Sequence, residues 1–380
     1  MNFPAVKPTS RYDAYMAANA PANPFAPAEQ LLASAIGQRI MPGCAYGVYA
    51  RGGVCWTGVL GGFTYESNSP RIAPGTRFDI ASLTKVVATT AAAMLLAQRN
   101  RLDLALKLGD LLPGFVIGRE DSHRARNVTL AHLLAHSAGL PGYVELFRAA
   151  QTPAQMLTAC LALPVEAEPG TLAVYSDPGF ILLGKAIEVI TGERLDLWCA
   201  REIHAPLGMT STGFNPRAPE RALIPPTEID RQFRQRTIQG EVQDENAAAM
   251  NGIAGHAGLF SNVSDLLRFA AAMIEAKPAA EQKTLFHAET IARFCERQPP
   301  AGSSRALGWD TPSDEASSAG HLFSSRSIGH LGFSGCSLWM DLDARIAVVL
   351  LTNRTWPDRQ QQGIKTLRPA FHDAVRAALA

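Results

Sequence analysis

A strong charge of one sign is missing from this sequence. Its 380 residues carry 35 Lys and Arg against 34 Asp and Glu, which gives a formal net charge of +1. Proteins that bind nucleic acid usually present a concentrated basic face, and the arginines here are scattered, so we expect no nucleic-acid partner. With 47% hydrophobic residues, the composition is that of a globular protein long enough for one large core or two packed lobes.

Cysteine is also sparse, and its spacing excludes two kinds of stabilised fold. The six cysteines are widely spread and form no CxxC pair, so neither a disulfide framework nor a zinc cluster is indicated. His132 and His136 have the spacing of a zinc-binding helix, but Leu133 occupies the position of the required glutamate. A phosphate-cradling glycine motif is lacking as well. We therefore expect no metal and no cofactor.

Long apolar runs are absent too. No stretch approaches the roughly 20 apolar residues that cross a bilayer, so no membrane span is expected. The N-terminal segment is polar and rich in Ala and Pro, without the apolar core of a secretory signal. These features predict a cytoplasmic protein.

Strand patterns occur at both ends of the chain. Residues 44–62 predict a hairpin of two strands, and residues 337–341 and 345–352 predict two more strands. A final helix is expected over about 369–379, because Pro369 suits the first position of a helix.

Mostly helical signals lie between these ends. The pattern predicts an α/β (α+β) fold in which one mostly antiparallel sheet is assembled from the two ends of the chain. Residues 1–75 and 305–380 are expected to form an α/β sandwich lobe, and residues 76–304 a mainly helical lobe. The active site is expected in the cleft between the lobes, where ligand pockets tend to form.

Ser82 and Lys85 are the first candidates for catalysis. They begin a helix predicted to run to about Gln98, and positions i and i+3 at a helix start lie on one face. A serine hydroxyl needs an adjacent base, which lysine supplies if burial and the positive helix end lower its pKa. The Ser82 backbone N–H is then available to an oxyanion. Alone, Ser-x-x-Lys is weak, because about one such pattern arises by chance and a capping serine beside a solvated lysine is the simpler explanation.

Two further segments carry chemically useful residues. Tyr175 precedes a helical run and can shuttle protons if lysine charges lower its pKa, while Asp177 can bridge it to Lys85 or cap the helix. The glycine-rich strand 329–335 lets a substrate backbone approach closely. Its N–H groups can complete an oxyanion hole, and His330 can bind a substrate carboxylate. A glycine bulge on an edge strand is the structural alternative.

Short motifs follow one another along roughly residues 40–375. They are Phe78–Lys85 (FDIASLTK), Val128–Pro141 (VTLAHLLAHSAGLP), Pro169-Gly170, Tyr175-Ser176-Asp177, Leu207–Met209 (LGM), Gly255–Ser261 (GHAGLFS) with Asp265, Gly308-Trp309, Gly329–Gly332 (GHLG) and Val348–Asn353 (VVLLTN). Each is weak alone, but the ordered set is specific. It resembles the β-lactamase-related serine hydrolases, the group around class C β-lactamases, D-alanyl-D-alanine carboxypeptidases and class VIII esterases.

This resemblance implies both a fold and a set of roles. The fold is the β-lactamase/transpeptidase-like one, a mostly antiparallel sheet flanked by helices with an inserted helical lobe. Ser82 is implied as the acyl-accepting nucleophile, Lys85 as its general base and Tyr175 as the proton relay, with the oxyanion between the N–H groups of Ser82 and Phe333. The positions implied to bind substrate or the oxyanion are Asp177, His330, Gly332 and Phe333.

The chain departs from the family pattern at two places. Asp177 stands where the β-lactamases usually carry asparagine, and His330-Leu331 replaces the Lys-Thr of the Lys-Thr-Gly motif. Both changes argue against efficient β-lactam hydrolysis. The resulting hypothesis is a cofactor-free serine hydrolase that acts on small-molecule carboxylic esters, small amides or D-amino-acid peptides. The alternatives are a penicillin-binding β-lactamase or D,D-carboxypeptidase, and a catalytically silent relative kept for binding.

Overall fold

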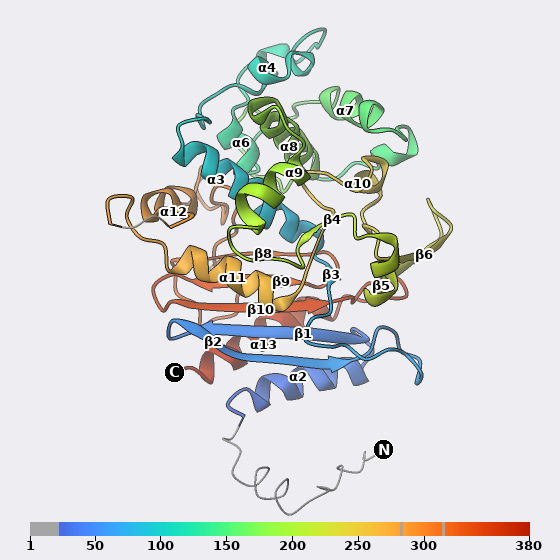
Figure 1. Ribbon diagram of the computed structural model, residues 1–380. Coiled ribbons are helices and arrows are strands. Elements are labelled where there is room, and N and C mark those ends of the chain that lie inside the picture. The colour runs from blue at the N-terminus through green and yellow to red at the C-terminus, as the bar shows by residue number, and fades with distance from the viewer. Residues whose placement is uncertain (1–22, 282–283, 314–315) are drawn as a thin grey trace, which may run out of the picture.

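A five-stranded antiparallel sheet carries the two ends of the chain. The computed structural model describes residues 23–281, 284–313 and 316–380 (Figure 1). The first 22 residues, which belong to the predicted 1–75 lobe and to the segment analysed for a secretory signal, lie outside the described residues. The sheet has the order β2-β1-β10-β9-β8. Its strands are β1 (Gly43–Ala50), β2 (Gly53–Gly61), β8 (Ser327–Leu331), β9 (Ser337–Asp341) and β10 (Ile346–Thr352).

Strands from the two ends of the chain are neighbours inside this sheet. β1 pairs antiparallel with β10, so that Cys44 lies opposite Thr352. Every residue of both strands is buried. The predicted hairpin and the two predicted C-terminal strands are confirmed.

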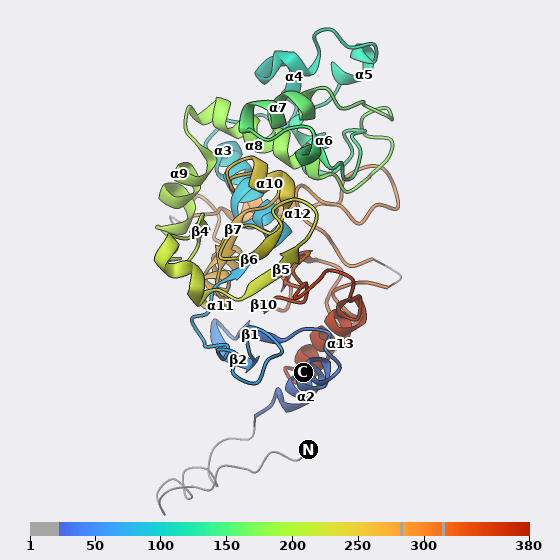
Figure 2. The same ribbon diagram turned by 90° about the vertical axis from the view of Figure 1, so that its right-hand side faces the viewer.

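Helices cover both faces of the sheet (Figures 1 and 2). α11 (Val263–Ile274) packs on β1 and β10 on one face. α2 (Ala26–Gly37) and α13 (Ile364–Ala377) pack against each other and share the core of the other face with Tyr46 and Val348. Because successive strand residues point to opposite faces, the continuous apolar runs of β1 and β10 serve two cores at once.

The last helix differs from its prediction. α13 begins at Ile364, and Pro369 lies inside it rather than at its first position. A proline removes one hydrogen bond from a helix interior. Ile364, Leu367, Phe371 and Val375 nevertheless recur at helical spacing and are all buried against the sheet. Burial of this apolar face outweighs the lost hydrogen bond, so the prediction of the helix start was wrong.

The middle of the chain is less purely helical than predicted. It contains a three-stranded sheet of order β3-β7-β4 and a hairpin of β5 and β6. In addition, α11 falls within the 76–304 range expected to form the helical lobe, yet it packs on the large sheet. The additional strands are β3 (Phe78–Asp79), β4 (Gly213–Phe214), β5 (Pro226–Asp230), β6 (Arg236–Gln239) and β7 (Leu259–Ser261).

One apolar run, Ala81–Gln98, is packed by α8 (Asp177–Thr191), α9 (Leu195–Cys199) and α12 (Ala288–Cys295). This run starts as a 3-10 turn, η1 (Ala81–Leu83), continues as a π-helical segment, η2 (Lys85–Thr90), and ends as α3 (Ala91–Gln98). Its length and composition would suit a membrane span, but 83% of it is buried inside the protein, as in a core helix. The middle of the chain also contains α4 (Leu108–Leu111), α5 (Ser122–Ala125), α6 (Leu130–Leu134), α7 (Pro153–Leu161) and α10 (Glu245–Ala249).

Shortening Phe371 to alanine should destabilise the sheet and its helical cover. The buried Phe371 ring meets Tyr46 of β1 edge-on, with ring centroids 5.6 Å apart. Removing a buried phenylalanine leaves a cavity and costs about 3–5 kcal/mol of unfolding free energy. Urea denaturation measures this change. Leu197→Ala, at a side chain that is 51% exposed, is the control, and an equal loss in both variants would contradict the packing described.

Candidate active site

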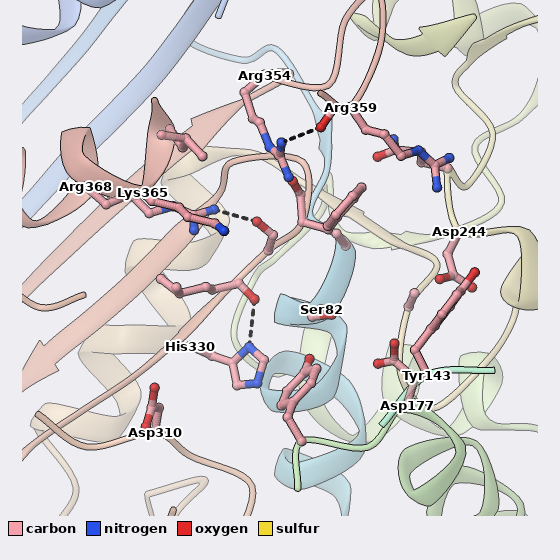
Figure 3. Close-up of a pocket in the computed structure, with 18 of the residues that line it drawn as sticks. Ser82, Tyr143, Asp177, Asp244, Asp310, His330, Arg354, Arg359, Lys365 and Arg368 are labelled. Carbon is pink, nitrogen blue, oxygen red and sulfur yellow. Dashed lines mark hydrogen bonds between the residues drawn. The ribbon is translucent and has the colours of Figure 1, made fainter. Parts of the chain in front are cut away.

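A cavity of about 560 Å³ opens beside β8, the edge strand of the large sheet. Its lining combines the start of the central helical run, the start of α8, β8 with its following turn, and the first turns of α13 (Figure 3). A cavity of this size suits a small-molecule ligand. The predicted site residues that line it are Ser82, Tyr175, Asp177, His330, Gly332 and Phe333.

Ser82 sits directly after a strained backbone position. Ala81 has a φ of +47°, a conformation that costs free energy for a residue with a Cβ. The Ala81 N–H donates to Asp79 Oδ1 at 2.8 Å, and the Gln243 N–H donates to the other carboxylate oxygen at 2.7 Å. The buried carboxylate therefore holds the turn that presents Ser82 to the cavity.

Lys85 is fully buried beside Ser82. Its Nζ lies 3.1 Å from Ser82 Oγ, 2.6 Å from Asp177 Oδ1 and 3.2 Å from the backbone oxygen of His256. An ammonium group has three hydrogens and no acceptor, so these three oxygens satisfy it completely. The predicted contact between Ser82 and Lys85 is present, and Asp177 joins it.

The charge state of Lys85 differs from the expectation. Burial alone lowers the pKa of Lys85, but the negative charge of Asp177 and its hydrogen bond to the ammonium outweigh burial and raise that pKa. The condition under which Lys85 was considered as a base, a lowered pKa, is therefore not met in the free protein. The physical reason is Asp177, which holds the proton on Lys85.

Asp177 is available to Lys85 because its neighbour caps the helix. Ser176 Oγ accepts from the Gly179 N–H at the start of α8 and donates to the Pro141 carbonyl. Asp177 therefore pairs with Lys85 and does not cap the helix.

Tyr175 is half-buried and lies among aromatic side chains. Its ring centroid is 4.5 Å from that of His136 and 4.8 Å from Lys85 Nζ. Burial raises the pKa of the Tyr175 hydroxyl, although the charge of Lys85 opposes this effect. The condition considered for proton shuttling, a pKa lowered by lysine charge, is therefore not met, and the phenol is neutral around pH 7. In this state Tyr175 is equipped to donate a proton.

His330 is also uncharged. Burial, together with the charges of Lys85 and Arg305, holds its pKa well below the usual range. His330 Nδ1 lies 2.8 Å from the carbonyl oxygen of Leu331 (Figure 3). A carbonyl only accepts, so Nδ1 carries the hydrogen and Nε2, which has no partner among the described residues, is an acceptor. In this state His330 has no positive charge with which to attract a substrate carboxylate.

The turn after β8 passes close to the serine segment. A Cβ at Gly332 would lie 2.6 Å from the backbone oxygen of Ile80, so glycine is required there for the approach. Phe333 follows, with a side chain that is 48% exposed. The Arg354 guanidinium lies 4.6 Å from the centroid of this ring.

One pair on the cavity wall was not predicted. Asp244 lines the cavity, caps α10 through the Ala247 N–H, and lies 2.8 Å from His256 Nε2. The backbone oxygen of the same His256 accepts from Lys85. The pair therefore fixes the loop that holds the lysine. The Gly255–Ser261 motif was the available signal for His256, whereas Asp244 belongs to no motif.

Comparisons with known proteins agree with this arrangement. The profile of the family described as Beta-lactamase matches residues 28–368. A protein of Escherichia coli (strain K12) named "Putative D-alanyl-D-alanine carboxypeptidase" is 31% identical over 303 residues, which cover 74% of this chain and 69% of the relative. A Salmonella typhimurium protein of the same name is 30% identical over 320 residues, covering 77% and 73%.

Solved structures share the fold at lower identity. "EstCE1, a hydrolase with promiscuous acyltransferase activity" superposes with a TM-score of 0.74 at 20% identity, covering 93% of this chain and 98% of that one. The octameric penicillin-binding protein homologue from Pyrococcus abyssi superposes with a TM-score of 0.69 at 21% identity, covering 90% and 75%. These structures confirm the predicted β-lactamase/transpeptidase-like fold class.

Asp177→Asn should lower the pKa of Lys85. The substitution removes the negative charge that holds the proton and leaves the desolvation of the buried amine in place. NMR titration of protein with isotope-labelled lysine measures this shift, and Lys85→Met assigns the signal. Lys185, which pairs with Glu188 at the surface, is the internal reference. An unchanged Lys85 titration in Asp177→Asn would show that the cause is misassigned.

Proposed function

The chain belongs to the β-lactamase family, and we propose that it is a serine hydrolase that transfers acyl groups to water through an ester on Ser82. One observation carries the proposal: Lys85 Nζ lies 3.1 Å from Ser82 Oγ beside a cavity of ligand size. A serine with an adjacent amine is an activated nucleophile. Membership of the β-lactamase family supports a hydrolase function in general, without specifying the substrate.

The proposed reaction uses Lys85 in its neutral form. The amine takes the Ser82 proton while Oγ bonds to the substrate carbonyl carbon, and the N–H groups of Ser82 and Phe333 receive the negative oxygen. Tyr175 then donates its proton to the leaving group and regains one from Lys85. Water attacks the acyl ester, gives a proton through Tyr175 to Lys85, and releases the acid while Ser82 regains its hydrogen. Because Asp177 favours protonated Lys85, the reactive fraction of the protein grows with pH.

The proposed substrates are carboxylic esters, small amides and D-amino-acid peptides. The cavity volume suits molecules of this size. The name shared by the curated relatives, putative D-alanyl-D-alanine carboxypeptidase, supports the peptide members of this set. A neutral His330 gives a substrate carboxylate, whether of a penicillin or of a peptide, no charge to pair with at this position.

Ser82→Ala should abolish turnover, with a loss on the order of 10⁴-fold or more, because it removes the nucleophile. Intact-mass spectrometry after incubation with a fluorophosphonate gives a direct measurement, since the reagent should label the wild-type protein and not the variant. Ser137→Ala is the matched control, because Ser137 lies in a pattern that approaches a nucleophile elbow.

Two labelling outcomes would count against this proposal. Label retained in Ser82→Ala would place the nucleophile elsewhere, and no label in the wild-type protein would favour a catalytically silent relative. A parallel incubation with a fluorescent penicillin addresses the remaining alternative, because labelling of Ser82 would assign the protein to the penicillin-binding enzymes.

Tyr175→Phe should slow turnover by on the order of 10²-fold, the usual scale for a general acid–base group. Phenylalanine keeps the ring that packs on His136, so the loss reports on the hydroxyl rather than on packing. Steady-state kinetics with a para-nitrophenyl ester measure it, and Tyr143→Phe, at another tyrosine of the cavity wall, is the comparison. Equal rates in Tyr175→Phe and wild type would remove Tyr175 from the mechanism.

A further inference from the structure

His136 is a buried residue of the Val128–Pro141 motif to which the proposed reaction gives no role. It follows α6 by two residues, is only 3% exposed, and is not among the residues that line the cavity. Its ring nevertheless lies 4.5 Å from the ring of Tyr175, centroid to centroid. His136 is therefore in direct contact with the proposed proton relay from outside the cavity.

His136 holds the backbone on both sides of Tyr175. Its carbonyl oxygen accepts from the Val174 N–H at 2.9 Å, and its side-chain Nδ1 accepts from the Ser176 N–H at 2.9 Å. The ring of Phe180, which is fully buried in α8, lies 4.9 Å from the His136 ring, centroid to centroid, so the imidazole is itself packed against a helix. One residue thus contacts the residue before Tyr175, the residue after it, and its ring.

The hydrogen bond to Ser176 determines the tautomer of His136. A backbone N–H only donates, so Nδ1 carries the lone pair and Nε2 carries the hydrogen. Burial, together with the positive charges of Arg305 and Lys85, holds the pKa of His136 well below its usual range. The ring is therefore neutral around pH 7, and Nδ1 remains available as an acceptor.

The conformation of His136 carries two costs. Its φ is +56°, in the left-handed region that residues with a Cβ avoid. Its buried Nε2–H has no acceptor within the part of the chain that the structure describes. Backbone strain and unpaired buried polar groups that persist in a fold are concentrated at functional sites. A phenylalanine would fill the same space without an unpaired donor, but it would leave the Ser176 N–H without its acceptor.

We propose that His136 is a positioning residue that holds the Tyr175 hydroxyl where it can pass a proton between Lys85 and the leaving group. His136 contacts neither the substrate nor the reacting atoms and acts only through Tyr175. A displacement of a catalytic group by about 1 Å can slow a reaction by as much as 10²-fold, so a small rotation of the tyrosine ring is enough to matter. The inference rests on the proposed hydrolase function and adds a residue to it.

His136→Phe is the main test, because it keeps an aromatic ring of similar size and removes the acceptor for the Ser176 N–H. It should lower kcat/KM for para-nitrophenyl acetate about tenfold. The loss should stay below the roughly 10²-fold expected for Tyr175→Phe, since misplacing a hydroxyl cannot cost more than deleting it.

A double-mutant cycle separates positioning from a general structural effect. In the Tyr175→Phe background, His136→Phe should cause no further loss, because the hydroxyl on which it acts is gone. A further loss of about tenfold in that background would overturn the proposal. His204→Phe, at another buried histidine outside the cavity lining, is the control and should leave kcat/KM unchanged in both backgrounds. Thermal unfolding checks that each variant is folded.

His136→Asn tests the acceptor directly and keeps the proposal testable if the phenylalanine variant does not fold. The Oδ1 of asparagine takes the place of Nδ1, and asparagine tolerates a positive φ. This variant should stay within about threefold of the wild-type kcat/KM, whereas His136→Ala, which has no acceptor, should lose about tenfold. Equal losses in these two variants would show that the bond to the Ser176 N–H is not the cause and would overturn the proposal.

Nitrogen NMR of protein with isotope-labelled histidine tests the geometry without turnover. His136 should be a neutral ring with its hydrogen on Nε2 from about pH 5 to 8, and the His136→Phe spectrum assigns its signals. A charged ring or a hydrogen on Nδ1 would overturn the proposal, because neither form accepts from Ser176. The fluorophosphonate reaction of Ser82 tests the hydrolase function separately, so a labelled Ser82 with a failed cycle would remove only the role of His136.

Discussion

A fully buried ammonium group is the constraint on which this site depends. Lys85 has no access to water, so its three hydrogens and its charge must be satisfied by the protein. Its acceptors come from its own turn and from positions 92 and 171 residues further along the chain. Removing one partner of a buried charge costs several kcal/mol. The serine turn, the start of α8 and the loop of His256 are thereby bound into one geometry.

The positive charge of Lys85 also influences the protonation states of the neighbouring side chains. His330 and His136 are neutral because both are buried and because the positive charges of Lys85 and Arg305 lower the pKa of both imidazoles. Burial keeps the Tyr175 hydroxyl protonated. The free site therefore holds its mobile proton on Lys85, beside Asp177. Uncharged aromatic side chains surround this ion pair. Interactions with charge that develops during a reaction are stronger in such a water-poor setting.

Much of the fold was readable from local pattern. The strands at both ends and the three-residue spacing of Ser82 and Lys85 depend on periodicity and helix geometry, which neighbouring residues determine. The departures arise where distant parts meet. Pro369 remains helical because the sheet buries the face around it, and the raised pKa of Lys85 requires a carboxylate 92 residues away.

Long-range contacts also explain the cavity residues that no motif marked. Arg354 and Arg368 reach the Phe333 turn from a loop and from α13, respectively. Asp244 reaches His256 across twelve residues of loop and helix. Nothing in the local spacing of these residues indicates a shared site, because the carbonyl oxygens and the ring nitrogen that they meet are supplied by the tertiary fold.

The pairing of β1 with β10 has a consequence for how this protein acquires its shape. The whole middle of the described chain separates these two strands, so the sheet cannot close until β10 has left the ribosome. Until then β1 is an apolar strand with an unpaired edge, the kind of surface that aggregates or is held by chaperones. Closing so distant a contact is slow. The β8 side of the cavity is synthesised in the same late stretch, so a nascent chain carries Ser82 and Lys85 well before the β8 wall of their cavity exists.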